Sequence, residues 1–399
     1  MKKTTDNHHF HTAAADENGT HPLEESAGAI PSKGSGQSGL NHSLRRFLTA
    51  LIATVLTLTL LCAAAVYVFD PFYHYHAPWL GLKAVLTDKE YQVVGTLRHF
   101  EYDTVLVGSS VVENNDNRWY DEAFGGTTIK AVRSYGGIAD LTWYLQEAFD
   151  AQEVTQVFFN IDPAALVLEA ETTFESSGCP MYLYDENPFN DIKYLLNKTV
   201  LLEKIPYLIA QSISDSYEEA LSYNWAEGKD FSEEGALSQY ARAKEVSQME
   251  AADAYEENLI ANLSLLTAVV EAHPETEFTF FYSPYSMLWW DDASRAGMLD
   301  AYLYCEKTVA AALLQYDNVR FYDFQNEEEI AADLSNYMDT VHFAPEINYE
   351  ICQALREGRC EVTQENLEET FARTKALAQE YIDGPIQQLE DEGRFLYSS

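Results

Sequence analysis

Short apolar runs alternate with segments of helical periodicity along most of the chain. The runs at 104–110, 128–136, 155–162, 277–284 and 319–324 are rich in β-branched or aromatic residues and end in Gly, Ser, Asp, Asn or Pro, which is typical of buried strands. Apolar residues recur every three or four positions at 255–270, and 141–149 has a similar pattern, which indicates helices. Strands alternating with helices predict an α/β domain with a parallel sheet covered on both faces.

The predicted α/β domain covers residues 96–361. Two segments, one inside this domain and one after it, depart from the alternation of strands and helices. Residues 170–249 begin with a Tyr-, Asn- and Pro-rich stretch and continue as acidic helical patterns, so we expect an insertion at the edge of the sheet where the strands end. Residues 362–399 are charged and helical in pattern and predict a C-terminal extension. Ligands of such sheets bind beyond the carboxyl ends of the strands, so functional residues are expected there.

A long apolar run near the N-terminus predicts one transmembrane helix at 45–69. From Phe47 to Phe69 the chain has no charge and no proline, and about 20 such residues span a bilayer. Arg45 and Arg46 precede the run, which places the N-terminus in the cytoplasm and the main domain outside. Residues 1–44 are predicted to be a disordered cytoplasmic tail, and 70–95 a juxtamembrane segment. Signal-peptide cleavage near Ala63 is the alternative, which the long preceding segment disfavours.

The charge and the cysteines exclude several classes of function. The chain carries 25 Lys and Arg against 64 Asp and Glu, a formal charge of −39, and such a surface repels phosphate backbones. The first 69 residues contain equal numbers of basic and acidic side chains, so the whole charge lies in the part expected outside the cell. The 5 cysteines form no CxxC pair and no zinc-binding spacing. We expect no nucleic-acid partner, no metal and no cofactor.

Two short motifs carry candidate chemistry at strand ends. Ser109 and Ser110 follow the first strand, where a strand-to-helix corner would present a hydroxyl beside free backbone N–H groups. Far downstream, Asp339 precedes His342 by three residues, a spacing at which the carboxylate can bond the imidazole Nδ1–H and leave Nε2 to accept a proton. Taken separately, the serines are ordinary turn residues, and an Asp and a His near a helix start are ordinary surface residues.

The order of these motifs resembles the SGNH, or GDSL-like, hydrolase superfamily. A serine follows the first strand, Gly136 and Gly137 follow the second, Asn160 ends the third, and the DxxH motif precedes the final helix. The resemblance covers about 104–355. It is closer to the membrane-anchored bacterial proteins of cell-surface polymer acylation, which resemble the DltD and alginate O-acetylation proteins, than to the secreted GDSL lipases.

This resemblance implies a three-layer α/β/α fold with a mostly parallel, flavodoxin-like sheet and a serine that attacks an ester carbonyl. Ser110 matches the nucleophile, His342 the general base, and Asp339 the residue that orients the base. Gly136 or Gly137 matches the oxyanion glycine, and their adjacency leaves the register open.

The third strand departs from the family pattern. The superfamily has its oxyanion asparagine in a G-x-N-D context, whereas this chain reads FFNIDP. Asn160 therefore lies one residue out of register, or Asp162 occupies the oxyanion site. An anionic Asp162 would repel an oxyanion.

Further substrate-binding candidates lie at the same edge of the sheet. Tyr282, Tyr285 and Trp289 follow the fourth strand, where aromatic faces would stack on sugar rings, although packing beneath the insertion explains them equally well. Ser109 and Asp162 are the other two candidates.

Two functional hypotheses follow. The first is a membrane-anchored, extracytoplasmic esterase or O-acyltransferase, with acetyl as the expected group, that modifies a neutral cell-envelope glycan of a bacterium through a serine acyl-enzyme. By the resemblance alone, a membrane-bound O-acyltransferase is its expected partner. The second is a catalytically inactive glycan-binding or scaffolding protein. A lipase or thioesterase would need an apolar channel and fits the Tyr-rich, acidic flanking segments least.

Overall fold

The computed structural model describes residues 36–214 and 216–398. The first helix, α1, runs over Gly36–Phe69, and its portion Asn41–Phe69 is long and apolar enough to cross a membrane as an anchor or to act as a signal sequence. It begins earlier than the span predicted at 45–69. The rest of the predicted tail, residues 1–35, lies outside the described part of the chain. A boundary between two compact units falls inside α1 after Thr57, and everything below concerns the second unit.

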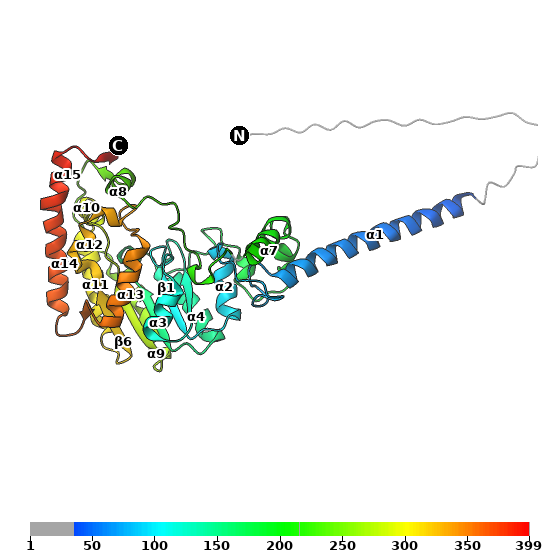
Figure 1. Cartoon of the computed structure of the whole chain (residues 1–399), viewed down its shortest axis with the longest axis horizontal. Coiled ribbons are helices and arrows are strands. Elements are labelled where there is room, and N and C mark those ends of the chain that lie inside the picture. Colours follow the sequence, from blue (N-terminus) through cyan, green and yellow to red (C-terminus); the bar gives the residue numbers. More distant parts are fainter. Residues whose placement is uncertain (1–35, 215, 399) are drawn as a thin grey trace, which may run out of the picture. The chain divides into compact units, whose positions relative to one another are not determined.

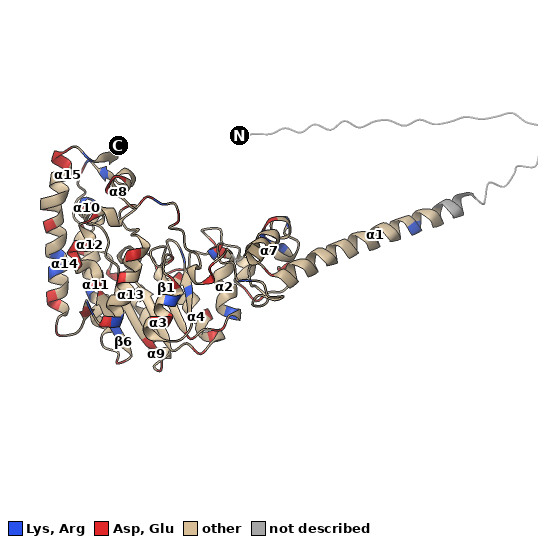
Figure 2. Cartoon of the chain, in the orientation of Figure 1, with Lys and Arg blue, Asp and Glu red and all other residues tan. Residues whose placement is uncertain are grey.

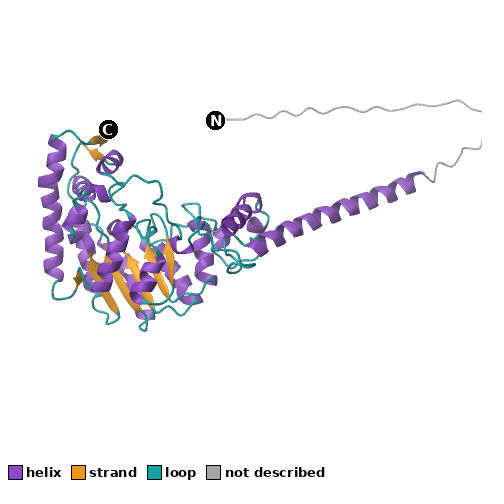
Figure 3. Cartoon of the chain, in the orientation of Figure 1, coloured by secondary structure: helices purple, strands orange, loops and turns teal. Residues whose placement is uncertain are grey.

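The second unit is built on one six-stranded sheet between helices (Figures 1 and 3). Its strand order is β2-β1-β3-β5-β6-β7. The first five are parallel and β7 is antiparallel to β6. The bounds are β1 Thr104–Gly108, β2 Thr128–Val132, β3 Gln156–Asn160, β5 Glu277–Tyr282, β6 Val319–Asp323 and β7 Glu361–Val362. The five predicted strands are confirmed, and their order is the one found in flavodoxin.

Helices connect the strands and cover the sheet. The helix α3 packs against α13, whereas α4 packs against α2 and α9, and α9 contacts α11. The bounds are α2 Lys89–His99, α3 Asn117–Phe124, α4 Ile138–Ala151, α5 Pro163–Leu166, α9 Glu256–Ala272, α10 Met287–Arg295, α11 Leu299–Leu313, α12 Glu328–Ala331 and α13 Pro345–Glu357. The strands between them are nearly continuous apolar runs, and Val105, Leu106 and Val107 of β1 are fully buried, as expected for a parallel sheet covered on both faces.

The predicted insertion is a series of short elements rather than a set of acidic helices. These are the 3₁₀ helix η1 Met181–Leu183, α6 Ile192–Leu195, the π-helix η2 Val200–Lys204, α7 Ile205–Ser214, the 3₁₀ helix η3 Glu219–Leu221, α8 Glu233–Gln239 and β4 Ala241–Ala243. The last strand of the insertion pairs with β8, Leu396–Ser398, near the C-terminus. Acidic side chains are spread over the helices and loops of this unit (Figure 2).

The C-terminal extension is helical as predicted, and it is packed onto the domain. The helix α14, Leu367–Tyr381, contacts α10 and α11 and buries Phe371, Leu377 and Tyr381. The π-helix η6, Ile382–Ile386, and α15, Gln387–Asp391, follow. Short 3₁₀ turns at Phe324–Asn326 and Leu334–Asn336 lead from β6 toward α13. The stretch before α13 carries Asp339 and His342, so it brings the DxxH motif to the carboxyl edge of the sheet.

Candidate active site

Ser110 lies directly beyond the carboxyl end of β1. Gly108 ends this strand, and a Cβ at that position would lie 2.1 Å from the Val112 side chain and 3.1 Å from Asn160. Only glycine therefore allows the chain to turn this closely. The turn is closed by a hydrogen bond of 3.1 Å from the Val112 N–H to the Ser109 carbonyl. This corner places the Ser110 hydroxyl beyond the carboxyl ends of the strands.

Ser110, His342 and Asp339 form one hydrogen-bonded series. Ser110 Oγ lies 2.7 Å from His342 Nε2, and His342 Nδ1 lies 2.7 Å from Asp339 Oδ2. The other carboxylate oxygen of Asp339 accepts the backbone N–H groups of Val341 at 2.9 Å and His342 at 2.8 Å. The two residues that the resemblance pairs as nucleophile and base therefore lie within hydrogen-bonding distance of each other. The arrangement allows the imidazole to accept the hydroxyl proton while its other nitrogen is held by a carboxylate.

The electrostatics keep Asp339 ionised. Burial by itself raises the pKa of a carboxyl group, but the hydrogen bonds and charge of His342, with the bond from Val341, outweigh burial and hold the pKa of Asp339 below its usual value. A carboxylate that stays charged stabilises the imidazolium that forms when His342 takes a proton.

The insertion contributes Trp225 to the same place. Its indole Nε1 donates to the Ser110 carbonyl at 3.1 Å, and its ring meets the His342 ring edge-on at a centroid distance of 5.1 Å. Trp225 therefore holds the backbone of the serine by a hydrogen bond and packs against the imidazole. The sequence analysis missed this residue, because no local pattern links the insertion to Ser110.

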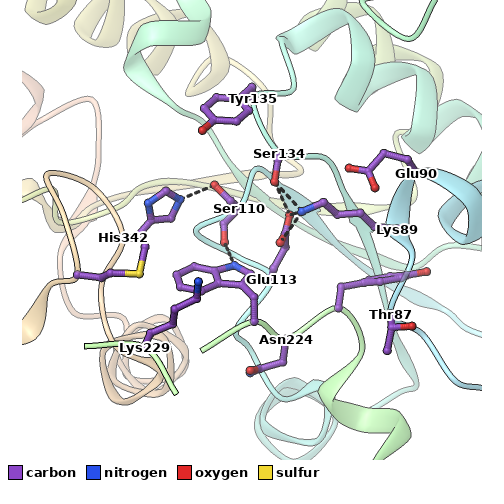
Figure 4. A pocket seen from close by; sticks show the side chains of 13 residues that line it. Thr87, Lys89, Glu90, Ser110, Glu113, Ser134, Tyr135, Asn224, Lys229 and His342 are labelled. Atoms are coloured by element: carbon purple, nitrogen blue, oxygen red, sulfur yellow. Dashed lines mark hydrogen bonds and ion pairs between the residues drawn. The ribbon is translucent and has the colours of Figure 1, made fainter. Parts of the chain in front are cut away.

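A cavity of about 510 Å³, lined mostly by polar residues, opens beside Ser110 and His342. Inside it, Lys89 Nζ lies 2.6 and 2.8 Å from the two Glu113 carboxylate oxygens and 2.6 Å from Ser134 Oγ (Figure 4). Burial raises the pKa of Glu113, and the charge of Lys89 opposes this. The remaining lining residues are Thr87, Glu90, Tyr135, Tyr223, Asn224, Trp225, Lys229 and Met338. The cavity is rich in hydrogen-bonding groups, and sequence reasoning had singled out none of these lining residues.

A second, smaller cavity of about 210 Å³ also borders Ser110 and His342. It is mostly apolar, and its lining residues besides Ser110 and His342 are Ser109, Val111, Tyr135, Gly136, Asp162, Ala164, Ala165, Leu168, Tyr285, Trp289 and Val341. The nucleophile candidate is thus shared by a large polar cavity and a small apolar one.

Three predicted oxyanion donors form hydrogen bonds with other groups of the protein. The Gly136 N–H donates to the Arg133 carbonyl at 3.0 Å, and the Gly137 N–H donates to Asp140 Oδ2 at 3.3 Å. The Asn160 amide is fully buried and donates to Ser283 Oγ at 2.8 Å. By contrast, the Ser110 N–H donates to no acceptor within the part of the chain that the structure describes. In this structure Gly136, Gly137 and Asn160 therefore use these groups for hydrogen bonds within the protein, and their role at an oxyanion stays a prediction, whereas the Ser110 N–H is available as a donor.

Asp162 is covered by two hydroxyl groups. Ser109 and Tyr285 both donate hydrogen bonds to its carboxyl group. Burial raises the pKa of Asp162 above its usual value, and these hydroxyls, with the charge of His342, oppose the rise. A carboxyl group that accepts two hydroxyl donors presents less negative charge to its surroundings than a bare one, which weakens the repulsion expected at this position.

The aromatic candidates separate into two groups. Tyr285 and Trp289 line the small cavity, whereas Tyr282 is 0% exposed and donates its hydroxyl to the Glu306 carbonyl at 2.9 Å. The structure thus corrects the placement of Tyr282, because its side chain on β5 faces the core. Substrate contact by Tyr285 and Trp289 stays a prediction.

Tyr135 is a further candidate that the sequence analysis missed. Its φ of 57° is in the left-handed region, where non-glycine residues are uncommon and strain is often associated with function. Its side chain is 90% exposed and lines both cavities, and Figure 4 shows it near Ser110 and His342. An exposed aromatic residue held in a strained turn beside a nucleophile is suited to contact substrate.

Within the described residues, no group of three or more His, Cys, Asp and Glu side chains could hold a metal ion. No known protein-family model matches the chain, and no curated protein matches its sequence. The chemistry of the candidate site is therefore the basis for a function.

Proposed function

We propose that the protein is a serine esterase or O-acyltransferase of the SGNH type, with Ser110 as the nucleophile. The observation that carries this proposal is the series of two 2.7 Å hydrogen bonds from Ser110 Oγ through His342 to Asp339. This series lies at the carboxyl edge of a parallel sheet, where ligands of such folds bind. The two cavities that meet at Ser110 provide separate space for the two halves of an ester.

In the proposed reaction, His342 Nε2 takes the Ser110 proton as Oγ attacks the ester carbonyl carbon. The Ser110 N–H donates to the oxyanion that forms. When the bond from the carbonyl carbon to the alcohol oxygen breaks, His342 returns the proton to the departing alkoxide, which leaves Ser110 acylated. A water molecule gives hydrolysis by the reverse proton movements, and a second hydroxyl gives transfer. Asp339 holds the His342 Nδ1–H and stabilises its cationic form.

The cavities favour a hydrophilic alcohol and a short acyl group. Lys89, Glu113 and Asn224 supply charged and amide groups to the large cavity, while Trp225 and Tyr135 supply aromatic surface, a combination suited to a sugar. The formal charge of −39 disfavours a strongly anionic polymer. We therefore favour a neutral glycan as the alcohol, and by the resemblance a bacterial cell-envelope glycan, an external domain anchored by α1 and a membrane-bound O-acyltransferase partner.

A fluorophosphonate probe tests the nucleophile. Full-length protein in detergent micelles is expected to gain one phosphonyl group, and peptide mapping should locate it on Ser110. His342→Ala should react far more slowly, because the hydroxyl loses its base. Ser264→Ala is a suitable control, because Ser264 is exposed on α9 and its hydroxyl donates to the Ala261 carbonyl of the same helix. Labelling of another serine, or equal labelling of wild type and His342→Ala, would contradict the proposal.

Filling the small cavity should exclude longer acyl groups from the site. Ala164 lines this cavity and is itself exposed, so Ala164→Phe adds volume without disturbing the core. We expect kcat/KM for p-nitrophenyl butyrate to fall about 10-fold relative to p-nitrophenyl acetate, as pocket contacts of this size discriminate. Ala272→Phe, at an exposed position at the end of α9, is the matched control. Equal losses for both esters would show that the acyl group lies elsewhere.

A second candidate is a non-catalytic glycan-binding or scaffolding protein. It is favoured because the predicted glycine and asparagine donors already form hydrogen bonds within the protein. With Gly136, Gly137 and Asn160 bonded within the protein, the oxyanion has fewer donors than the family pattern supplies. Under this alternative the fluorophosphonate would not react, while Trp225→Ala would still weaken retention on immobilised glycan.

A further inference from the structure

Exposed apolar side chains are concentrated in one part of the insertion. Within residues 189–214, Phe189 is 90% exposed, Ile213 79% and Leu202 69%. The other exposed apolar side chains of this segment are Ile192, Leu196 and Tyr207. The tip of the loop at 79–82 adds Trp79 and Leu80, of which Leu80 is 73% exposed. We call residues 79–80 and 189–214 the anchor-proximal surface. Soluble surfaces seldom expose so many large apolar side chains within one segment.

The anchor-proximal surface is fixed to the chain that follows α1. Tyr194 donates its hydroxyl to Asp70 at 2.7 Å and accepts the Phe72 N–H at 3.1 Å. Asp191 accepts the Tyr75 hydroxyl at 3.1 Å. These bonds are all within the unit that begins at Leu58.

The loop at 79–82 is attached to the same place. The Lys83 N–H donates to Ser212 Oγ of α7 at 3.0 Å, and the Trp79 ring contacts Tyr67 near the end of α1 at a centroid distance of 6.0 Å. The apolar tip of this loop therefore adjoins the C-terminal end of the apolar helix, and a hydrogen bond joins the same loop to α7.

The charge of this segment differs from that of the rest of the chain. Residues 189–214 contain three lysines and two acidic residues, in a chain whose formal charge is −39. One of the acidic residues, Asp191, is buried. Lys193 and Lys198 are exposed, and in the described part of the chain neither forms an ion pair with a carboxylate. An apolar, locally basic surface is therefore held beside the end of the helix that can span a membrane.

We propose that the anchor-proximal surface lies in the interfacial region of the same bilayer that α1 crosses. This inference rests on the proposed anchoring by α1. Apolar side chains of an interfacial helix enter the boundary between headgroups and acyl chains, Trp and Tyr favour this depth, and exposed lysines are attracted to anionic lipid. Each of these features is present here, and the contacts to Asp70 and Phe72 make the surface continuous with the spanning helix.

This docking would also orient the candidate site. Lys204 of the segment forms an ion pair with Asp88, with Nζ 2.6 Å from a carboxylate oxygen. The neighbours of Asp88 in the chain, Thr87 and Lys89, line the large polar cavity. A segment held at the bilayer would thus restrain the rim of this cavity near the membrane surface, instead of leaving the domain free to turn on its anchor.

Labelling from the lipid phase tests the inference. Full-length protein is reconstituted in vesicles of phosphatidylcholine and phosphatidylglycerol that contain a phosphatidylcholine with a diazirine on its acyl chain. After photolysis, peptides from α1 and from 189–214 are expected to carry the lipid adduct. The internal control is the peptide around 246–260, whose Val246, Met249 and Ile260 are also exposed apolar residues.

A pair of triple variants sharpens the result. Phe189→Ser, Leu202→Ser and Ile213→Ser together should remove most of the label from 189–214 and leave α1 labelled. Val246→Ser, Met249→Ser and Ile260→Ser together should change nothing. If α1 is labelled and 189–214 is labelled no more than 246–260, the interfacial surface is overturned and the anchor stands. If α1 itself is not labelled, the anchor fails and the inference fails with it.

Discussion

Ser110→Ala is expected to lower the hydrolysis of p-nitrophenyl acetate by about 10³-fold or more, because loss of the nucleophile in serine hydrolases has effects of this size. The Ser110 hydroxyl is bonded to His342 Nε2 at 2.7 Å, and no other hydroxyl in the described part of the chain bonds that nitrogen. The measurement is the release of p-nitrophenol by full-length protein in detergent micelles, corrected for the reaction without enzyme.

The pattern across variants distinguishes catalysis at this site from a nonspecific reaction. His342→Ala should lose about as much activity as Ser110→Ala, and the double variant should lose no more than either, because residues that act as one unit are not additive. Ser264→Ala should retain wild-type activity. Additive losses, or an active Ser110→Ala variant, would remove Ser110 from the mechanism.

The strands could be predicted because their signal is local. A parallel sheet buried on both faces needs apolar runs of five or six residues, and those runs are visible at 104–110, 155–162 and 277–284. The two-residue strand β7 and the pair β4 and β8 were missed, because such short strands form where tertiary packing brings segments together, and they leave no periodic pattern.

The candidate triad was predictable in part for the same reason. Asp339 and His342 are three residues apart, so their contact depends on one local turn, and the resemblance supplied the distant serine. Trp225 could not be found this way. Its hydrogen bond to Ser110 spans 115 residues and depends on how an irregular insertion folds back over the sheet edge.

The oxyanion donors show where motif order fails. Gly136 and Gly137 follow β2 as the family pattern requires, but the turn that contains Tyr135 with φ of 57° directs the Gly136 N–H to the Arg133 carbonyl. Whether an N–H is free depends on the dihedral angles of the turn, which glycine tolerates in many forms. The sequence therefore located the glycines at the correct edge without determining what their N–H groups bond.

Lys130→Met is expected to destabilise the second unit by about 3 to 5 kcal/mol, because it leaves several buried polar groups unsatisfied at about 1 to 3 kcal/mol each. Lys130 is 0% exposed on β2. Its Nζ donates to the carbonyls of Glu113 at 2.8 Å, Asn115 at 2.5 Å and Ser222 at 2.7 Å. These bonds join the loop after Ser110 to the part of the insertion that carries Trp225. Methionine keeps most of the apolar volume but leaves three buried carbonyls without this donor.

The penalty should depend on pH in a defined direction. Burial lowers the pKa of Lys130 to about 7, although the charges of Glu113 and Asp116 oppose the shift, whereas an unfolded lysine has a pKa of about 10.4. Between these values the unfolded chain binds more protons at this position than the folded chain, so the stability contributed by Lys130 increases as the pH rises. The loss on substitution by methionine should thus be smallest below pH 7, where both states are protonated, and larger near pH 9.

Urea unfolding of full-length protein in micelles, followed by tryptophan fluorescence at pH 6 and near pH 9, measures both effects. Lys307→Met is the matched control, because Lys307 is on the surface of α11 and pairs only with the exposed Glu368; surface pairs of this kind contribute about 1 kcal/mol or less. If the two methionine variants unfold at the same urea concentration, the hydrogen bonds of Lys130 to the loop after Ser110 and to the insertion do not stabilise the second unit. If the Lys130→Met penalty is the same at pH 6 and near pH 9, the lysine stays protonated in both the folded and the unfolded chain over this range, and its three carbonyls stabilise the ammonium at least as much as burial destabilises it.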